Sequence, residues 1–215
     1  QLARLSTAGI AALTSTQAAA LSTTQLAGLT SGQVAALGTL ALAGLTTAQL
    51  ASLSVAQFTG LTAGQLAALS NPQIVALSTA QLATLTPAEV AALTTAQMAA
   101  LTTAQFVSLS TLQMQALTSD QVAALTTAQI ASITTGDLAA LQTEDFAAMT
   151  SGQVAVLSAT QVAGLGTDDI AALDAADLAT LSTAASAQEL ASSGISLPTQ
   201  PALSPLGDRI VFTYP

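Results

Sequence analysis

The stretch LTTAQMAA, residues 93–100, is one copy of an eight-residue unit that recurs without insertion or deletion from Leu5 to Thr180, in 22 copies. With the positions lettered a to h, position a is Leu in 20 copies and position f is always apolar. Position b is Ser or Thr in 18 copies, and position e is Gln, Glu or Asp in 20. A fixed period of this kind indicates stacked repeats that form one elongated body instead of a globule.

Each octad carries a complete helix-start signal. A Ser or Thr followed three residues later by Gln or Glu is a capping box, in which each side chain bonds the other residue's backbone N–H. Thr94 and Gln97 occupy these two places. Leu93 before the cap and Met98 four residues after it form the hydrophobic pair that accompanies such a start. Pro87 falls at the first helical position, where proline is well tolerated.

Two other readings of the octad fail. In one continuous helix, eight residues at about 100° each overshoot two turns by about 80°, so the Leu stripe would have no single face to bury. In a strand, positions a and f would lie on opposite faces. The sequence therefore predicts an all-α solenoid of very short helices that bends at every a–b junction. The number of octads in one coil of the solenoid, and its handedness, stay open at this point.

The octad register divides the chain into three segments. Residues 1–181 are the predicted octapeptide-repeat solenoid, residues 182–197 a terminal capping helix and turn, and residues 198–215 a Pro-rich linker with a single β-strand. The opening residues 1–4 fit positions e to h, so we interpret the chain as a processed product or a piece of a longer array. A lone strand is not stable, so the strand must pair with another protomer, an exposed backbone edge or a following domain. Its residues, and the predicted self-association site, are Ile210, Val211, Phe212, Thr213 and Tyr214.

A few octads depart from the pattern. The octad that begins at Leu37 has Gly38 at position b and Ala41 at position e, so it lacks both capping partners and predicts a looser coil. Leu40 and Leu112 stand at position d, which is normally small, and are candidate exposed contact points. The residues expected to fill core space at position f include Phe58, Phe106 and Phe146.

The charge content excludes several classes of partner. The chain has 2 Lys and Arg against 11 Asp and Glu, and it carries no charged residue between Ser6 and Ala88. Nucleic-acid binding needs clustered Lys and Arg, and so does attraction to an anionic membrane surface. A membrane-spanning helix needs about 20 apolar residues in a row, whereas polar residues interrupt every octad. We expect no nucleic-acid partner and no membrane insertion.

The sequence also predicts that the protein is not an enzyme. It contains no His, Cys or Lys, which removes the usual general bases and nucleophiles, and no cofactor motif is present. The candidate metal ligands are carboxylates in two consecutive octads, which could hold Ca²⁺ because hard cations take oxygen ligands. The favoured alternative is that acids at positions b and e serve as helix caps. The four candidate metal ligands are Asp168, Asp169, Asp174 and Asp177, of which Asp169 and Asp177 stand at position e and Asp174 at position b.

Position c has no role in capping, yet it is Ser or Thr in 16 of the 22 copies. Three interpretations stay open. The hydroxyl array is a plain polar surface, a self-association face, or a flat array for ice or for O-glycosylation. The first is favoured, and self-association comes next because the first half of the array carries no charge to keep molecules apart.

The Leu-Thr-Thr-Ala-Gln-apolar-Ala-Ala octads of residues 1–181 resemble the tandem arrays of very large secreted or surface proteins of bacteria, including adhesin-like proteins. The resemblance implies an extracellular or cell-surface location and a stalk or fibre role. We therefore expect a structural rod, stalk or self-assembling filament subunit, whose partner is another copy of itself, joined by its C-terminal strand. The alternative is an adhesin module that presents one face of the solenoid to a surface protein or glycan.

Overall fold

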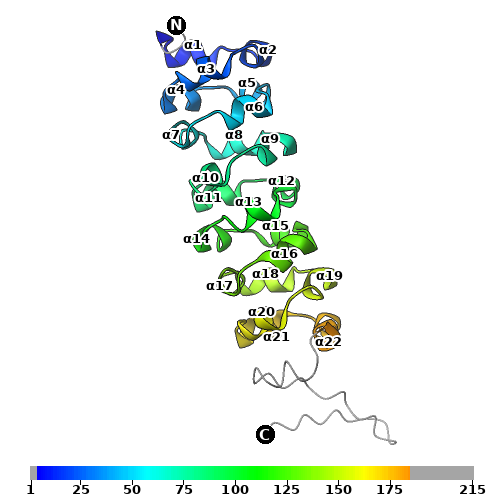
Figure 1. The fold of residues 1–215 in the computed structure, drawn as a ribbon. Helices are drawn as coiled ribbons and strands as arrows, with labels where there is room; N and C mark the ends of the chain where they lie inside the picture. The colour runs from blue at the N-terminus through cyan, green and yellow to red at the C-terminus, as the bar shows by residue number, and fades with distance from the viewer. Residues whose placement is uncertain (1–3, 185–215) are drawn as a thin grey trace, which may run out of the picture.

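The computed structural model describes residues 4–184, and within this range the chain forms a row of short α-helices with no strand (Figure 1). The helices of this range are α1 (Thr7–Ala11), α2 (Ser15–Ala19), α3 (Thr23–Ala27), α4 (Ser31–Ala35), α5 (Thr39–Ala43), α6 (Thr47–Ala51), α7 (Val55–Phe58), α8 (Ala63–Ala67), α9 (Asn71–Val75), α10 (Thr79–Leu82), α11 (Pro87–Ala91), α12 (Thr95–Ala100), α13 (Thr103–Phe106), α14 (Thr111–Met114), α15 (Ser119–Ala124), α16 (Thr127–Ser132), α17 (Thr135–Leu138), α18 (Thr143–Ala147), α19 (Ser151–Val154), α20 (Ala159–Ala163), α21 (Thr167–Ala172) and α22 (Ala175–Ala184).

Each octad yields one helix because the next capping residue ends it. Thr94, the N-cap of α12, has an extended backbone (φ −70°, ψ 156°), and its hydroxyl accepts a hydrogen bond from Gln97 N at 3.1 Å. The helix before it, α11, ends at Ala91, and its C-cap Ala92 still has a helical backbone (φ −83°, ψ −13°). An extended residue inside every eight cannot belong to a continuous helix. The predicted all-α solenoid of very short helices is confirmed for the described residues.

Three octads make one coil of the solenoid. Each helix packs on the helix three places further along the chain, as α2 does on α5, α12 on α15 and α18 on α21. Three octads of eight residues place 24 residues in a coil. Figure 1 shows the coils stacked into a rod, with α1 at one end and α22 at the other. Positions 24 residues apart therefore lie on neighbouring coils of the same face.

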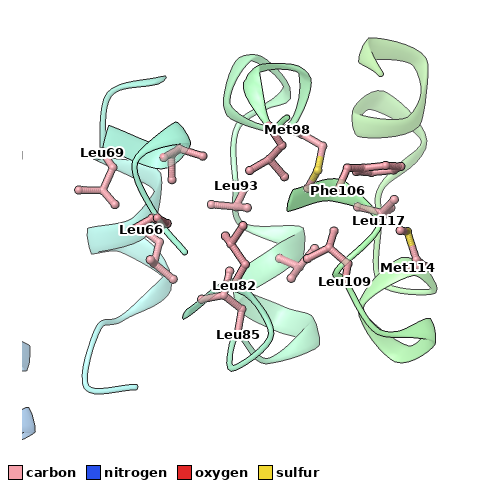
Figure 2. Close-up of a cluster of buried hydrophobic side chains, with 14 of the residues drawn as sticks. Leu66, Leu69, Leu82, Leu85, Leu93, Met98, Phe106, Leu109, Met114 and Leu117 are labelled. Atoms are coloured by element: carbon pink, nitrogen blue, oxygen red, sulfur yellow. The ribbon is translucent and has the colours of Figure 1, made fainter. Parts of the chain in front are cut away.

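The a and f side chains fill the space inside the coils. From Ile10 to Val162, every position-f side chain is at most 2% exposed. Figure 2 shows Met98, Phe106 and Leu117 among the side chains that lie between the helices of successive coils. The buried apolar residues form one continuous cluster along the rod. The predicted core role of the three position-f phenylalanines is confirmed, because each is at most 1% exposed.

The octad that lacks both capping partners still forms a regular helix. α5 follows Gly38 with no side-chain cap, yet it has five residues, and Leu42 within it is fully buried. The expected looser coil is therefore not seen. Its small residues allow close packing: a Cβ added at Gly44 would lie 2.7 Å from Ser15 Cβ in the preceding coil. Packing between coils replaces the missing cap, since most helix stability in proteins comes from tertiary contacts.

The last described helix departs from the octad pattern. α22 has ten residues, Ala175–Ala184, and passes through Leu181 and Ser182 without a bend. Residues 182–184 thus extend α22, whereas the rest of the expected capping helix and turn, up to residue 197, lies outside the described residues. The Pro-rich segment 198–215 and its expected strand Ile210–Tyr214 also lie outside them.

Candidate functional site

The side chain at position e makes the main polar contact between successive coils. Gln97 Oε1 accepts a hydrogen bond from Thr94 N at 2.8 Å, which completes the cap of α12. Gln97 Nε2 donates to Leu69 O at 2.7 Å and to Leu66 O at 2.9 Å in the preceding coil. These oxygens belong to the bend after α8, where helix-end carbonyls lack intrahelical partners. We call the position-f, g and a carbonyls of such a junction the bend carbonyls.

This contact repeats along the rod as a glutamine ladder. Every position-e Gln from Gln33 to Gln161 donates through Nε2 to the position-a carbonyl 28 residues earlier, at 2.5–3.0 Å. These glutamines are only 1–6% exposed. Buried polar groups are stable only when they are hydrogen-bonded. The ladder thus satisfies both the buried amides and the bend carbonyls.

Sequence reasoning assigned these glutamines to capping alone and missed the contact between coils. A usable signal was present. Position e holds 15 Gln but a single Glu, Glu89, although a capping box accepts either residue. Only the amide can also donate a hydrogen bond at neutral pH. Glu89 caps Thr86 N at 2.7 Å through its carboxylate, which has no hydrogen for the preceding coil.

Aspartates interrupt the ladder in the C-terminal coils. A carboxylate cannot donate to the bend carbonyls, and Asp is one methylene shorter than Gln. Three of these aspartates accept instead from the position-c hydroxyl of the preceding coil, which gives that hydroxyl a structural role. The pairs are Thr111 Oγ1 to Asp137 Oδ1 (2.9 Å), Ser119 Oγ to Asp145 Oδ1 (2.9 Å) and Thr143 Oγ1 to Asp169 Oδ1 (3.0 Å).

Asp145 is the buried member of these three acids. Its side chain is 2% exposed, and burial raises the pKa of this carboxyl above its ordinary value. Hydrogen bonds from Gln142 N and Ser119 Oγ act in the opposite direction, whereas the charge of Glu144 adds to the increase in pKa. Gln142 also replaces part of the missing ladder, because its Nε2 donates to Gln115 O at 3.2 Å.

The candidate calcium ligands do not come together as a metal site. Among the described residues, no group of three or more His, Cys, Asp or Glu side chains could hold a metal ion. Asp174 Oδ1 accepts from Asp177 N at 2.7 Å, and Asp169 Oδ2 accepts from Gly166 N at 3.2 Å, so both act at helix starts. Asp168 is exposed, and Asp177 is buried with its Oδ1 unpaired.

A shallow hollow lies between the end of α14 and the start of α18. Its volume is about 400 Å³, and it opens to solvent. The lining residues are Gln115, Ala140, Leu141, Gln142, Thr143 and Glu144. Its polar groups are those of the broken ladder described above, so the hollow marks a structural junction.

The two expected contact leucines are exposed, as predicted. Leu40 is 79% and Leu112 is 67% exposed. They stand at position d of α5 and α14, which belong to the same face of the rod because α5, α8, α11 and α14 pack on one another in succession. Three coils separate the two side chains along that face. None of the helices in residues 4–184 has the length and apolarity needed to cross a bilayer.

Comparison with known proteins identifies the class of repeat. The fold and its ladder define a tandem-repeat α-solenoid, and the family described as the ALTTAQ repeat matches segments that together cover more than half of the chain. The matched residues are 1–31, 61–95, 74–111, 90–127, 98–135, 130–167 and 138–175. The chain therefore belongs to the ALTTAQ repeat family. No curated protein matches it.

Proposed function

We propose that this chain is a structural element, a rod that serves as a stalk or as a filament subunit outside the cell. The main support for this proposal is that the residues repeated in the octads have structural roles. Position b caps helices, positions a and f fill the core, and position e ties the coils together. The residues that recur in every octad thus maintain a rod, and rigid length is the property that such a fold provides.

Self-association belongs to this proposal. Residues 6–88 carry no charged side chain, so that half of the rod offers no charge repulsion to a second copy. The extracellular location rests on the resemblance to arrays in secreted and surface proteins. In this proposal the C-terminal residues Ile210–Tyr214 join two copies by adding a β-strand to the neighbouring subunit.

A second candidate function is a binding module for a surface protein or a glycan. It is favoured by Leu40 and Leu112, which are large, exposed and on one face of the rod. Large exposed apolar side chains on an otherwise small and polar surface are candidate contact points. In this case the face that carries Leu40 and Leu112 would contact the surface protein or glycan, and the rest of the rod would hold that face in place.

Electron microscopy of the full chain and of a chain that lacks residues 206–215 tests the structural proposal. Fibres or chains of rods that disappear on truncation would support assembly through the C-terminal strand. Fibres in both samples would support assembly through another part of the rod. Monodisperse short rods in both samples would contradict the filament form and favour a spacer or binding module. Compact particles would contradict the rod itself.

A further inference from the structure

The helices of the rod stand in three rows, because each helix packs on the helix three places further along the chain. One row contains α4, α7, α10, α13, α16 and α19, which belong to successive coils. We call the exposed side chains of the octads in this row the neutral face. These octads are residues 29–36, 53–60, 77–84, 101–108, 125–132 and 149–156. The neutral face therefore runs along most of the described rod.

The neutral face has no charge and no large side chain. None of its octads contains Asp, Glu, Lys or Arg, and every exposed residue in them is Ser, Thr, Ala, Gly or Val. Three of the four exposed valines of residues 4–184 belong to it, namely Val55, Val107 and Val156, which are 37–41% exposed. Small side chains lose little conformational entropy when a second surface covers them, and an uncharged surface has no ions to desolvate. Contact through this face therefore has a low cost.

The acidic side chains of the rod lie mainly in the other two rows. Asp120, Glu144 and Asp168 are exposed at position d of α15, α18 and α21, which pack on one another. In the third row, α11 and α17 carry Glu89 and Asp137. Acids enter the row of the neutral face only in the octad of α22, which packs on α19. Two copies that meet through their neutral faces thus bring no carboxylate into the contact.

We propose that two copies of the rod pack side by side through their neutral faces. Each copy carries a net charge of −9, and Arg4 is the only cationic side chain in residues 4–184. Contact through either of the other rows would bring the carboxylates of two copies together without cations to offset them, whereas contact between neutral faces leaves the acids on the outer sides. This inference rests on the proposed function as a self-associating rod, and it names the surface that joins the copies.

The dimensions of the neutral face suit a reversible contact. Six helices that stack about 9 Å apart and are each about 10 Å wide give a footprint of about 550 Å² on each copy. Two such footprints approach the lower end of the range of about 1,200–2,000 Å² of total area that specific interfaces bury. We therefore expect an association that depends on protein concentration, and not a permanent dimer.

The neutral face winds around the rod. In Figure 1, α4 and α7 lie on the left side of the rod, α13 lies near its middle, and α19 lies on its right side. Two straight rods would touch along only part of such a face. Copies that wind around each other keep the whole face in contact, as helices do in a coiled coil. The expected pair is therefore twisted.

Matched pairs of charge substitutions test this surface. Ala56→Glu with Ala104→Glu places two charges on the neutral face, at position d of α7 and α13. Ala48→Glu with Ala96→Glu places the same charges at position d of α6 and α12, which belong to the row of α15 and α18. All four alanines are exposed, and the two members of each pair lie two coils apart. The variants therefore differ only in the row that carries the charges.

Two measurements on the full chain distinguish side-by-side pairs from rods joined end to end. Sedimentation velocity over a range of concentrations measures the strength of association. Small-angle X-ray scattering measures the mass per unit length, which doubles in a side-by-side pair and does not change in an end-to-end chain. Circular dichroism checks that both variants keep the helix content of the unaltered chain.

We expect the unaltered chain and the variant of α6 and α12 to form pairs with twice the mass per unit length of one rod. The variant of α7 and α13 should associate at least about tenfold more weakly, because its carboxylates would be buried without partners. Equal association of the two variants would overturn the pairing through the neutral face, and equal weakening of both would overturn it as well.

An unaltered chain that keeps the mass per unit length of one rod at every concentration would also overturn the pairing, and would leave the neutral face to another uncharged partner such as a glycan. The proposed structural role would survive that result. Compact particles in electron microscopy, in contrast, would contradict the rod itself and with it the proposed function.

Discussion

Position e requires an amide because both of its polar atoms are used. In Gln97, Oε1 satisfies an N–H at the start of its own helix and Nε2 satisfies carbonyls at a helix end in the preceding coil. A helix of one and a half turns has as many unpaired backbone groups at its ends as a long helix, but far fewer internal bonds. One glutamine per octad therefore supplies hydrogen bonds that such short helices cannot supply by themselves.

Gln97→Glu separates these two tasks. The carboxylate keeps the cap but loses the donor and places a charge against buried carbonyls, so the free energy of unfolding should fall by about 1–3 kcal/mol or more. Gln17→Glu, whose Nε2 meets no carbonyl in the described chain, should change it by less than about 0.5 kcal/mol. Thr94→Ala, which removes a cap alone, should cost about 1 kcal/mol. Urea unfolding of monomeric protein measures all three, and equal effects of the two glutamine variants would refute the contact between coils.

Gly60 and Gly32 test how closely the coils approach. A Cβ at Gly60 would collide with the backbone oxygen of Ser31 in the preceding coil, whereas a Cβ at Gly32 would meet nothing within 4 Å. Gly60→Ala should therefore lower the free energy of unfolding by about 1–3 kcal/mol through overpacking. Gly32→Ala, inside α4, should raise it by up to about 1 kcal/mol through helix propensity. Thermal unfolding of both variants checks the opposite signs, and a stabilised Gly60→Ala would contradict the packing.

At the scale of the helices, we expect the coil that contains Asp145 to be sensitive to pH. The pKa of Asp145 is raised in the folded chain by burial, so the protonated form is favoured by folding. Its contribution to stability is fully present below the unfolded pKa and is lost as pH rises through the folded pKa. The free energy of unfolding of the unaltered chain should thus fall relative to Asp145→Asn as pH rises through this window. Measuring both chains at each pH cancels the titration of the other acids, and a difference that is constant with pH, or changes in the other direction, would contradict this account.

The helices could be predicted from the sequence because their signals are local. A capping residue, its partner three residues later and the two apolar positions lie within a single octad, so Thr94 and Gln97 reveal the start of α12 without any knowledge of the fold. The number of octads in a coil could not be predicted, because it depends on how α12 packs on α15, 24 residues later. The second role of Gln97 was missed for the same reason. Its acceptors, Leu66 O and Leu69 O, lie 31 and 28 residues away in the chain.

α5 is a helix that the local sequence signals do not predict correctly. Gly38 and Ala41 offer no capping side chains, and the octad pattern alone predicts a looser coil there. The helix forms because its neighbours on either side are set by their own caps and because the small residues of α5 let it lie close to α2. The acidic octads also could not be interpreted from local signals. Asp169 accepts a hydrogen bond from the hydroxyl of Thr143, which lies 26 residues earlier in the chain and in the preceding coil.

At the scale of the whole molecule, the solenoid is a quasi-one-dimensional object. Each coil contacts only the coils before and after it, so length is gained by adding coils and the middle of the rod resembles its ends. The two ends of the rod nevertheless differ, because the neutral coils come first and the acidic coils come last. The rod therefore has a direction, because its two ends differ in charge and in hydrogen bonding. Head-to-tail association requires such a difference between the ends.

The coil of three octads is tested most directly by distances between paired spin labels. The chain has no Cys, so pairs can be introduced at Ala80 with Ala88, Ala96 or Ala104, which are all exposed position-d alanines. Dipolar electron paramagnetic resonance then compares separations of one, two and three octads. The account predicts that the Ala80–Ala104 pair is the closest of the three, because α10 packs on α13. A shorter distance for the Ala80–Ala96 pair, or a steady increase from one octad to three, would contradict the three-octad coil and with it the glutamine ladder.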